Sequence, residues 1–275
     1  MKKVLYTITI LVLLAVFAFS AFQVVTYIMD SRQQAQEYDA LAQLKQEAMD
    51  NATRPTEKPE KTEKPAPEEG TEPEETDPTG ETEPRMLEAY QALYEMNNDM
   101  VGWLTIPGTK VDYPVMQTPD RPNYYLERNF NESFSKHGCL YAREEADIQK
   151  PSDNVTIYGH NMLDGSMLAA LHDYIDKDKW EENNLIFFDT LYEYHVYEIF
   201  AVFKTTASLG KGFQYHQLID AESEEAFDEY IATCKELAFY DTGITPVYGD
   251  KLICLSTCEY TLANGRLVVM ARRIS

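Results

Sequence analysis

A cysteine and an arginine near the C-terminus have the residue types and the spacing for covalent chemistry. Cys258 closes an apolar, β-branched run over 251–257, and Arg266 precedes a second apolar run over 267–271. Such runs predict two neighbouring strands, and the Asn-Gly pair at 264–265 predicts a short turn between them. We therefore expect a hairpin that holds a thiol and a guanidinium close together at one rim of a sheet.

The alternation of side chains along a strand assigns the residues around the thiol to two faces. Cys254, Ser256 and Cys258 should point to one side of the sheet, and Leu255 and Thr257 to the other. Ser256 and Thr257 lie close enough to the thiol to line a groove for substrate. We treat both as candidates for substrate binding.

The chemistry that suits a thiol beside a guanidinium is attack on a carbonyl group. Cys258 would be the nucleophile, and Arg266 would donate to the oxyanion, because a guanidinium never loses its proton. A proton carrier would complete the set, and His160 stands at the end of another apolar strand. Asn161 and Glu259 flank these candidates and could orient them or bind substrate.

Several motifs together resemble the sortases, the cysteine transpeptidases of Gram-positive cell surfaces. A Leu-Ser-Thr-Cys strand at 255–258 is followed by the Arg strand, and a Tyr-Gly-His-Asn run stands far upstream at 158–161. The segments that look like the N-terminal part of class B sortases are 98–109, 111–117 and 124–126. The resemblance covers roughly residues 86–274, and its motifs occur in the expected order.

The resemblance implies a mechanism and its partners. Cys258 would attack the threonyl carbonyl of a C-terminal sorting signal on a surface protein and form a thioacyl enzyme. His160 would protonate the leaving amine, and Arg266 would hold the oxyanion. An amine from a peptidoglycan precursor, or from a pilin lysine, would then displace the enzyme. Neither a metal nor an organic cofactor is required.

The domain is expected to be mainly β. Eight short β-rich runs, divided by Pro, Gly and Asn, suggest a closed eight-stranded barrel of the sortase type. Helical spacing predicts an N-terminal helix over 86–96, a short helix over 167–174, and a helical insertion over 222–237 with Asp220 as its cap. Class B sortases carry a helix before the cysteine strand, so this assignment rests on the resemblance as well. The expected strands are 101–106, 111–116, 138–141, 155–158, 185–188, 194–204, 251–255 and 267–271.

The N-terminus predicts a membrane anchor. Residues 4–29 form an uncharged and mostly apolar run, which as a helix is about 39 Å long and can span a bilayer. Lys2 and Lys3 favour a cytoplasmic N-terminus over 1–3, which places the rest of a single-pass protein of the cell membrane outside the cell. The alternative is a signal peptide cleaved near the small residues Ser20 and Ala21, but its apolar region would be unusually long.

Two further segments separate the anchor from the domain. Residues 30–50 show helical spacing of apolar side chains, which predicts a juxtamembrane amphipathic helix able to self-associate. Residues 51–85 consist almost wholly of Thr, Glu, Pro, Lys and Gly, and predict a disordered tether that reaches about 100 Å when extended. The extracytoplasmic sortase domain is expected over 86–275.

The charge of the chain excludes one class of partner. Its formal net charge is −22, and residues 86–275 hold 15 basic against 30 acidic side chains. Such a domain would repel a phosphate backbone, so we expect no nucleic-acid binding. The acidic exterior suits a basic, amine-rich partner, or serves solubility alone.

Four cysteines leave other uses open. Cys254 and Cys258 lie about 13 Å apart along one strand, beyond disulfide reach. Cys139 and Cys234 could pair, although buried free cysteine is ordinary packing. A zinc site of His137 with Cys139, Cys254 and Cys258 is the rival use, but the spacing contains no CxxC pair.

The candidate residues also admit other functions. The same three side chains would serve a membrane-anchored cysteine hydrolase that cuts surface proteins without rejoining them. A non-catalytic surface module that kept the fold is the third possibility. In that case His160 would be a turn histidine and Arg266 would cover a rim of the barrel with its stem.

Overall fold

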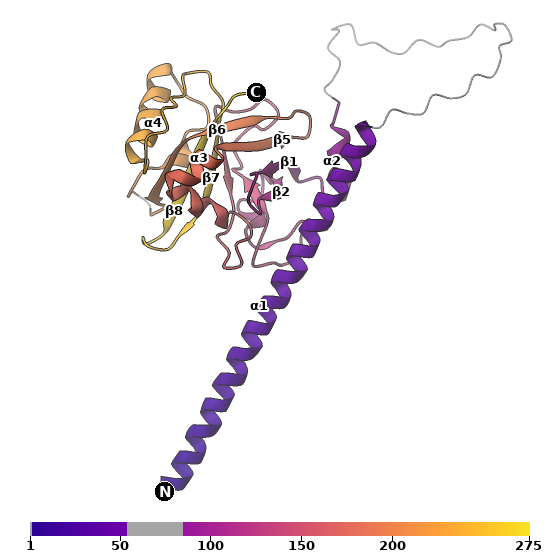
Figure 1. Ribbon diagram of the computed structural model, residues 1–275, viewed down its shortest axis with the longest axis vertical. Helices are drawn as coiled ribbons and strands as arrows, with labels where there is room; N and C mark the ends of the chain where they lie inside the picture. The colour runs from indigo at the N-terminus through magenta and orange to yellow at the C-terminus, as the bar shows by residue number, and fades with distance from the viewer. Residues whose placement is uncertain (1, 54–84, 209) are drawn as a thin grey trace, which may run out of the picture.

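The structure is a computed structural model that describes residues 2–53, 85–208 and 210–275, so the predicted tether over 51–85 lies almost wholly outside the described residues. Its eight strands close into a barrel in the order β1-β2-β3-β4-β7-β8-β6-β5, because β5 pairs back onto β1. The prediction of a mainly β, eight-stranded fold is confirmed (Figure 1). The strands are β1 Met100–Thr105, β2 Asp112–Met116, β3 Leu140–Ala142, β4 Asn154–Tyr158, β5 Leu185–Thr190, β6 Val196–Thr206, β7 Leu252–Glu259 and β8 Gly265–Arg273.

The three helices predicted within the domain lie where the pattern placed them, with two differences. α2 precedes β1, and α4 lies between β6 and the cysteine strand β7, as predicted. The short helix expected after His160 is the 3-10 helix η2. Asp220 does not cap α4. The N-cap is Ser223, whose hydroxyl accepts from the Ala226 amide, because Asp220 accepts from the Asp153 amide instead. The helical elements are α1 Lys2–Thr53, α2 Glu88–Met96, η1 Tyr124–Glu127, η2 Ala169–Ile175, α3 Lys177–Glu182, η3 Tyr215–Gln217 and α4 Glu224–Leu237.

Side chains on the two faces of β7 pack into two separate hydrophobic clusters. Leu255 belongs to the larger cluster, which fills the barrel, and Cys254 belongs to a smaller cluster between α4 and strands β6, β7 and β8. Phe227 and Cys234 of α4 close this smaller cluster from outside. Burying apolar area on both faces fixes the register of β7, because a slip of one residue would exchange the two faces.

The β7–β8 hairpin confirms the expected pair and shows a connection longer than the Asn-Gly pair alone. Cys258 lies directly opposite Arg266 in the antiparallel register. β7 continues one residue past Cys258 to Glu259, and the connection takes the five residues 260–264, with the Asn-Gly pair at its C-terminal end. Asn264 adopts a left-handed conformation with φ of 52°, and Gly265 starts β8. A Cβ at Gly265 would lie 2.4 Å from the Glu259 carbonyl, so glycine serves close strand approach there.

The predicted anchor and the predicted juxtamembrane helix form one continuous helix, α1. Its N-terminal half stands away from the domain with its apolar side chains exposed, and its C-terminal half packs along the domain (Figure 1). Tyr38 and Leu41 are buried against the barrel cluster. The middle of the apolar stripe that predicted self-association is therefore covered by the chain's own domain, whereas Leu44 is 39% exposed.

Polar contacts set the position of α1 on the domain. The Tyr38 hydroxyl donates to the Gly138 carbonyl at 2.7 Å. The Lys45 ammonium lies 2.7 Å from the Asp112 carboxylate, which also accepts from the Trp103 indole at 2.5 Å. These bonds are directional, so they select one rotation of the helix against the barrel.

The docking of α1 is expected to weaken in acid. Burial raises the pKa of Asp112, but the bonds from Lys45 and Trp103 outweigh it and lower the pKa below its ordinary value. Burial likewise opposes the charge of Asp164, yet hydrogen bonds from Ser166 and Ser31 hold its pKa well below the ordinary value. Docking free energy is therefore fully present above about pH 4 and is lost as the pH falls toward the lowered values.

Spin labels at positions 47 of α1 and 194 of the domain, in the full chain in detergent, measure this loss as a broadened distance distribution. Near-ultraviolet circular dichroism controls for unfolding of the barrel. Lys45→Met removes the ammonium and should reduce the pH dependence to the part that Asp164 contributes. A sharp, unchanged distance down to about pH 2 contradicts the prediction.

Candidate active site

Cys258 and Arg266 face each other across the last two strands. Both side chains are half-buried at the rim of the barrel, next to the 260–264 loop. One Arg266 nitrogen, Nη1, donates to the Gly265 carbonyl at 2.9 Å and to the Asn264 carbonyl at 3.5 Å. No carboxylate in the described ranges forms an ion pair with Arg266. The remaining guanidinium donors are thus available to an oxygen beside the thiol.

The parallel pairing of β4 with β7 brings His160 to the same rim. The register matches Tyr158 with Ser256, and the chain continues past β4 toward Cys258. The Thr257 hydroxyl donates to the Gly159 carbonyl at 2.8 Å, and the Asn161 amide donates to the Cys258 carbonyl at 3.2 Å. The residues on both sides of His160 are therefore hydrogen-bonded to Thr257 and to the backbone of Cys258. Asn161 positions this loop.

The imidazole of His160 is itself bonded to a backbone carbonyl. Its Nε2 lies 2.7 Å from the Leu126 oxygen. A carbonyl only accepts, so Nε2 carries the hydrogen, and in the neutral ring Nδ1 is the nitrogen that can take up a proton. The sequence could not show this partner, because a backbone carbonyl has no residue-type signature.

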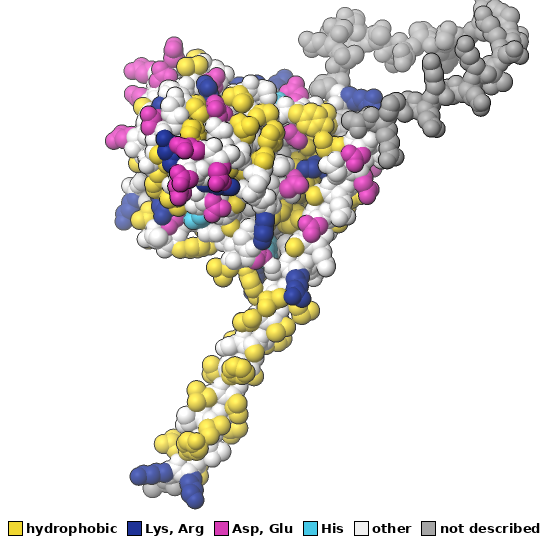
Figure 2. All heavy atoms as spheres, in the orientation of Figure 1, with side chains coloured by type: hydrophobic (Ala, Val, Ile, Leu, Met, Phe, Trp, Pro, Cys, Tyr) yellow, Lys and Arg dark blue, Asp and Glu magenta, His cyan; other side chains and the backbone are white. Residues whose placement is uncertain are grey.

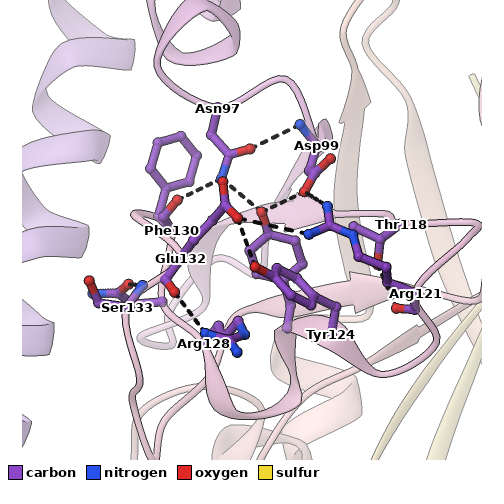
Figure 3. Close-up of polar contacts among 11 residues, drawn as sticks. Asn97, Asp99, Thr118, Arg121, Tyr124, Arg128, Phe130, Glu132 and Ser133 are labelled. Atoms are coloured by element: carbon purple, nitrogen blue, oxygen red, sulfur yellow. Dashed lines mark hydrogen bonds and ion pairs between the residues drawn. The ribbon is translucent and has the colours of Figure 1, made fainter.

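A polar network holds the loop that carries this carbonyl (Figure 3). Arg121 lies 2.8 Å from the Asp99 carboxylate and stacks over the Tyr124 ring, 3.9 Å from its centroid. The Tyr124 hydroxyl donates to Glu132 at 2.8 Å. Several charge-assisted contacts converge on η1 and the residues after it, so the carbonyl is presented from a fixed position.

Ser256 and Thr257 are buried and bonded within the protein. The Ser256 hydroxyl lies 2.6 Å from the Tyr215 hydroxyl, and Thr257 is bonded to the loop before His160 as described above. Each anchors β7 to a neighbouring segment. A substrate-binding role for these two residues, and for Asn161, stays a prediction.

Glu259, the residue after Cys258, is a buried anion. Burial raises its pKa, but the hydrogen bonds from Thr261 and the Lys204 ammonium, 3.0 Å away, outweigh it and lower the pKa to about 2. Its carboxylate therefore stays charged at neutral pH and fixes the start of the 260–264 loop. Its part in substrate binding likewise stays a prediction.

The other three thiols are less suited to nucleophilic attack. Cys139, Cys234 and Cys254 are buried, whereas Cys258 is half-buried, and all four are free. Burial raises the pKa of Cys139 to about 12 and raises those of Cys234 and Cys254 as well, so these thiols stay protonated. Cys139 and Cys234 belong to different hydrophobic clusters and are not paired. Within the described ranges, no three His, Cys, Asp or Glu side chains are placed to hold a metal.

Comparison with known proteins adds independent findings. The sequence model of the Sortase domain family matches residues 104–274. Sortase B of Listeria monocytogenes is 34% identical over 185 residues, which cover 66% of this chain and 73% of that protein.

The chain also superposes on solved structures of sortase B and of a protein similar to it. A Staphylococcus aureus sortase B-substrate complex superposes with a TM-score of 0.72 at 23% identity, covering 90% of this chain and 99% of the other. A Bacillus anthracis protein described as similar to sortase B gives a TM-score of 0.62 at 30% identity, covering 70% of this chain and 86% of the other. The first, at this identity, speaks for the fold alone.

Proposed function

The chain belongs to the sortase family of cysteine transpeptidases, and we propose that it acts on surface proteins at the outer face of the cell membrane. It cleaves a C-terminal sorting signal through a thioacyl intermediate and joins the new carboxyl group to an amine of a cell-wall precursor or a pilin lysine. The observation that carries this proposal is the register pair of Cys258 and Arg266 with the His160 loop bonded beside it.

The proposed steps use these three side chains. The Cys258 thiolate adds to the substrate carbonyl, and free Arg266 donors stabilise the oxyanion that forms. The C–N bond then breaks as protonated His160 gives its proton to the leaving amine. A second amine attacks the thioester, returns a proton to His160 and releases the thiolate. Ser256, Thr257, Asn161 and Glu259 would shape the groove around these groups.

The proposed location rests on α1. Among the described residues, α1 is the one helix that is both long enough and apolar enough to cross a membrane. Lys2 and Lys3 precede the apolar run, which favours a cytoplasmic N-terminus and a single span over residues 4–29. Residues 86–275 would then form an extracellular catalytic domain. The tether over 51–85 would link the docked helix back to this domain.

Transfer to an amine separates this function from simple hydrolysis. Both reactions pass through the same thioacyl enzyme, so the second nucleophile decides between them. With the full chain in detergent and a library of Pro- and Thr-containing sorting peptides, a glycine peptide or hydroxylamine should raise turnover and appear in a new amide or hydroxamate. Mass spectrometry of the products measures this.

A matched peptide with its threonine replaced by valine serves as the control for sorting-signal recognition. Fast hydrolysis that amines neither accelerate nor divert would favour the cysteine hydrolase. The absence of any cleaved peptide from the library would contradict the proposed substrate class.

A further inference from the structure

The contacts between α1 and the domain begin in the last turn of the apolar run of α1. The run ends at Met29, and the Ser31 hydroxyl already donates to the Asp164 carboxylate. Two residues along a helix span about 3 Å. One turn earlier, the Tyr27 ring stacks with the His137 ring at a centroid distance of 6.4 Å. If α1 spans a bilayer as proposed, the loops with Asp164 and His137 lie at the membrane surface.

Two large apolar side chains are exposed on these same loops. Leu163, next to Asp164, is 95% exposed, and Phe134 is 69% exposed. The Ser135 hydroxyl donates to the Gln34 side chain at 2.7 Å, which ties the Phe134 loop to the first docked turns of α1. Figure 2 shows apolar side chains at the edge of the domain from which the apolar part of α1 emerges.

Three basic side chains lie on the segments that carry or adjoin this pair, together with the carboxylates of Asp30, Glu132 and Asp164. Arg32, Lys110 and Lys136 are exposed, and the Lys110 ammonium donates to the Asp164 carbonyl at 2.7 Å. Residues 86–275 carry twice as many acidic as basic side chains. At this edge the Asp164 carboxylate is already bonded to the Ser31 hydroxyl and lies 3.2 Å from the His137 ring, while the three cations are exposed. Cations beside exposed apolar residues are the pattern that binds anionic lipid headgroups.

We infer that Phe134, Leu163, Arg32, Lys110 and Lys136 form a membrane-contact edge that binds the surface of an anionic bilayer. Phe134 and Leu163 enter the boundary between headgroups and acyl chains, and the three cations lie among the lipid phosphates. The inference rests on the proposed anchoring by α1.

The membrane-contact edge has a consequence for the proposed reaction. Leu163 follows His160 by three residues, and the 260–264 loop lies at the same end of the domain, the end toward the exposed half of α1 (Figure 1). The active-site end would therefore face the bilayer. A sorting signal that is still attached to its own membrane segment would reach Cys258 without leaving the surface.

Lipid quenching in the full chain tests the membrane-contact edge. In a Cys258→Ala background the other three cysteines are buried, so an added cysteine can be labelled alone. Leu163→Cys and Phe134→Cys receive an environment-sensitive fluorophore, and the protein is placed in nanodiscs containing phosphatidylglycerol and headgroup-nitroxide lipid. Val247→Cys is the matched control, because Val247 is an apolar residue that is 61% exposed in the loop before β7, at the strand end away from Cys258.

The labels at 163 and 134 should be quenched at least about twofold more than the label at 247, as expected for side chains at headgroup depth. Lys136→Gln should reduce quenching at 134 in anionic nanodiscs and leave it unchanged in zwitterionic ones. Equal quenching at positions 163, 134 and 247 overturns the inference.

A label on α1 distinguishes failure of the membrane-contact edge from failure of the proposed anchoring by α1. Phe17 lies in the middle of the apolar run and is 72% exposed. Quenching of a Phe17→Cys label by acyl-chain nitroxides, without quenching at 163, leaves the anchor in place and rejects only the membrane-contact edge. A Phe17→Cys label that no lipid quencher reaches rejects both.

Discussion

Replacing Cys258 with alanine is expected to abolish both cleavage and transfer while leaving the fold intact. The thiol is the only half-buried cysteine, and the other three are buried with raised pKa values, so no other thiol can replace it. Loss of the nucleophile should lower kcat by a factor on the order of 10⁴ or more. Peptide cleavage followed by chromatography measures the loss. Thermal unfolding should change little, because the side chain fills no core position.

Cys254→Ala is the matched control for this variant. It removes a thiol from the same strand and the same face, four residues away, but from the cluster beneath α4. This variant should keep most of its turnover and lose some stability, because a buried side chain has become smaller. Labelling by a thiol reagent should disappear in Cys258→Ala and persist in Cys254→Ala. Turnover of Cys258→Ala at the wild-type rate would exclude the covalent mechanism.

The pairing of thiol and guanidinium could be predicted because it depends on local rules. An alternating apolar pattern fixes which face of β7 Cys258 occupies, and a hairpin brings the next strand into register beside it. The length of the connection could not be predicted, because the Asn-Gly pair indicates a turn but does not say how many residues precede it. In the structure the Glu259 carboxylate accepts from the Thr261 hydroxyl and pairs with the Lys204 ammonium. These contacts stabilise the longer 260–264 loop, and they form only when Glu259 is buried.

Two features depended on long-range contacts and could not be predicted. The stripe over residues 30–50 indicated an amphipathic helix, but a stripe does not say which surface covers it. The choice rests on the fit of Tyr38 under the Gly138 loop and of Lys45 beside Asp112. The orientation of His160 likewise depends on a carbonyl at Leu126, 34 residues away in the sequence. Such contacts exist only once the barrel has closed.

Replacing Arg266 with lysine is expected to impair turnover badly, although the charge is kept. One guanidinium nitrogen is already committed to the carbonyls of Gly265 and Asn264, and the others are free to donate beside Cys258. A lysine ammonium is a single point of donation and cannot reproduce this planar fork. Loss of an oxyanion donor lowers kcat by about 10²–10³. Steady-state kinetics should show the loss in kcat, with KM affected less.

Arg272→Lys separates this role from a general need for arginine on β8. Arg272 lies on the same face of the strand at its far end, where it pairs with Glu198 at 3.5 Å, so its conservative replacement should leave kcat unchanged. Alkylation of Cys258 should proceed at a similar rate in Arg266→Lys, which would show that the thiol is still presented. If Arg266→Lys turned over nearly as fast as the wild type, Arg266 would serve to cover the rim of the barrel. The oxyanion would then need another donor, and the backbone amides around Cys258 would be the first to examine.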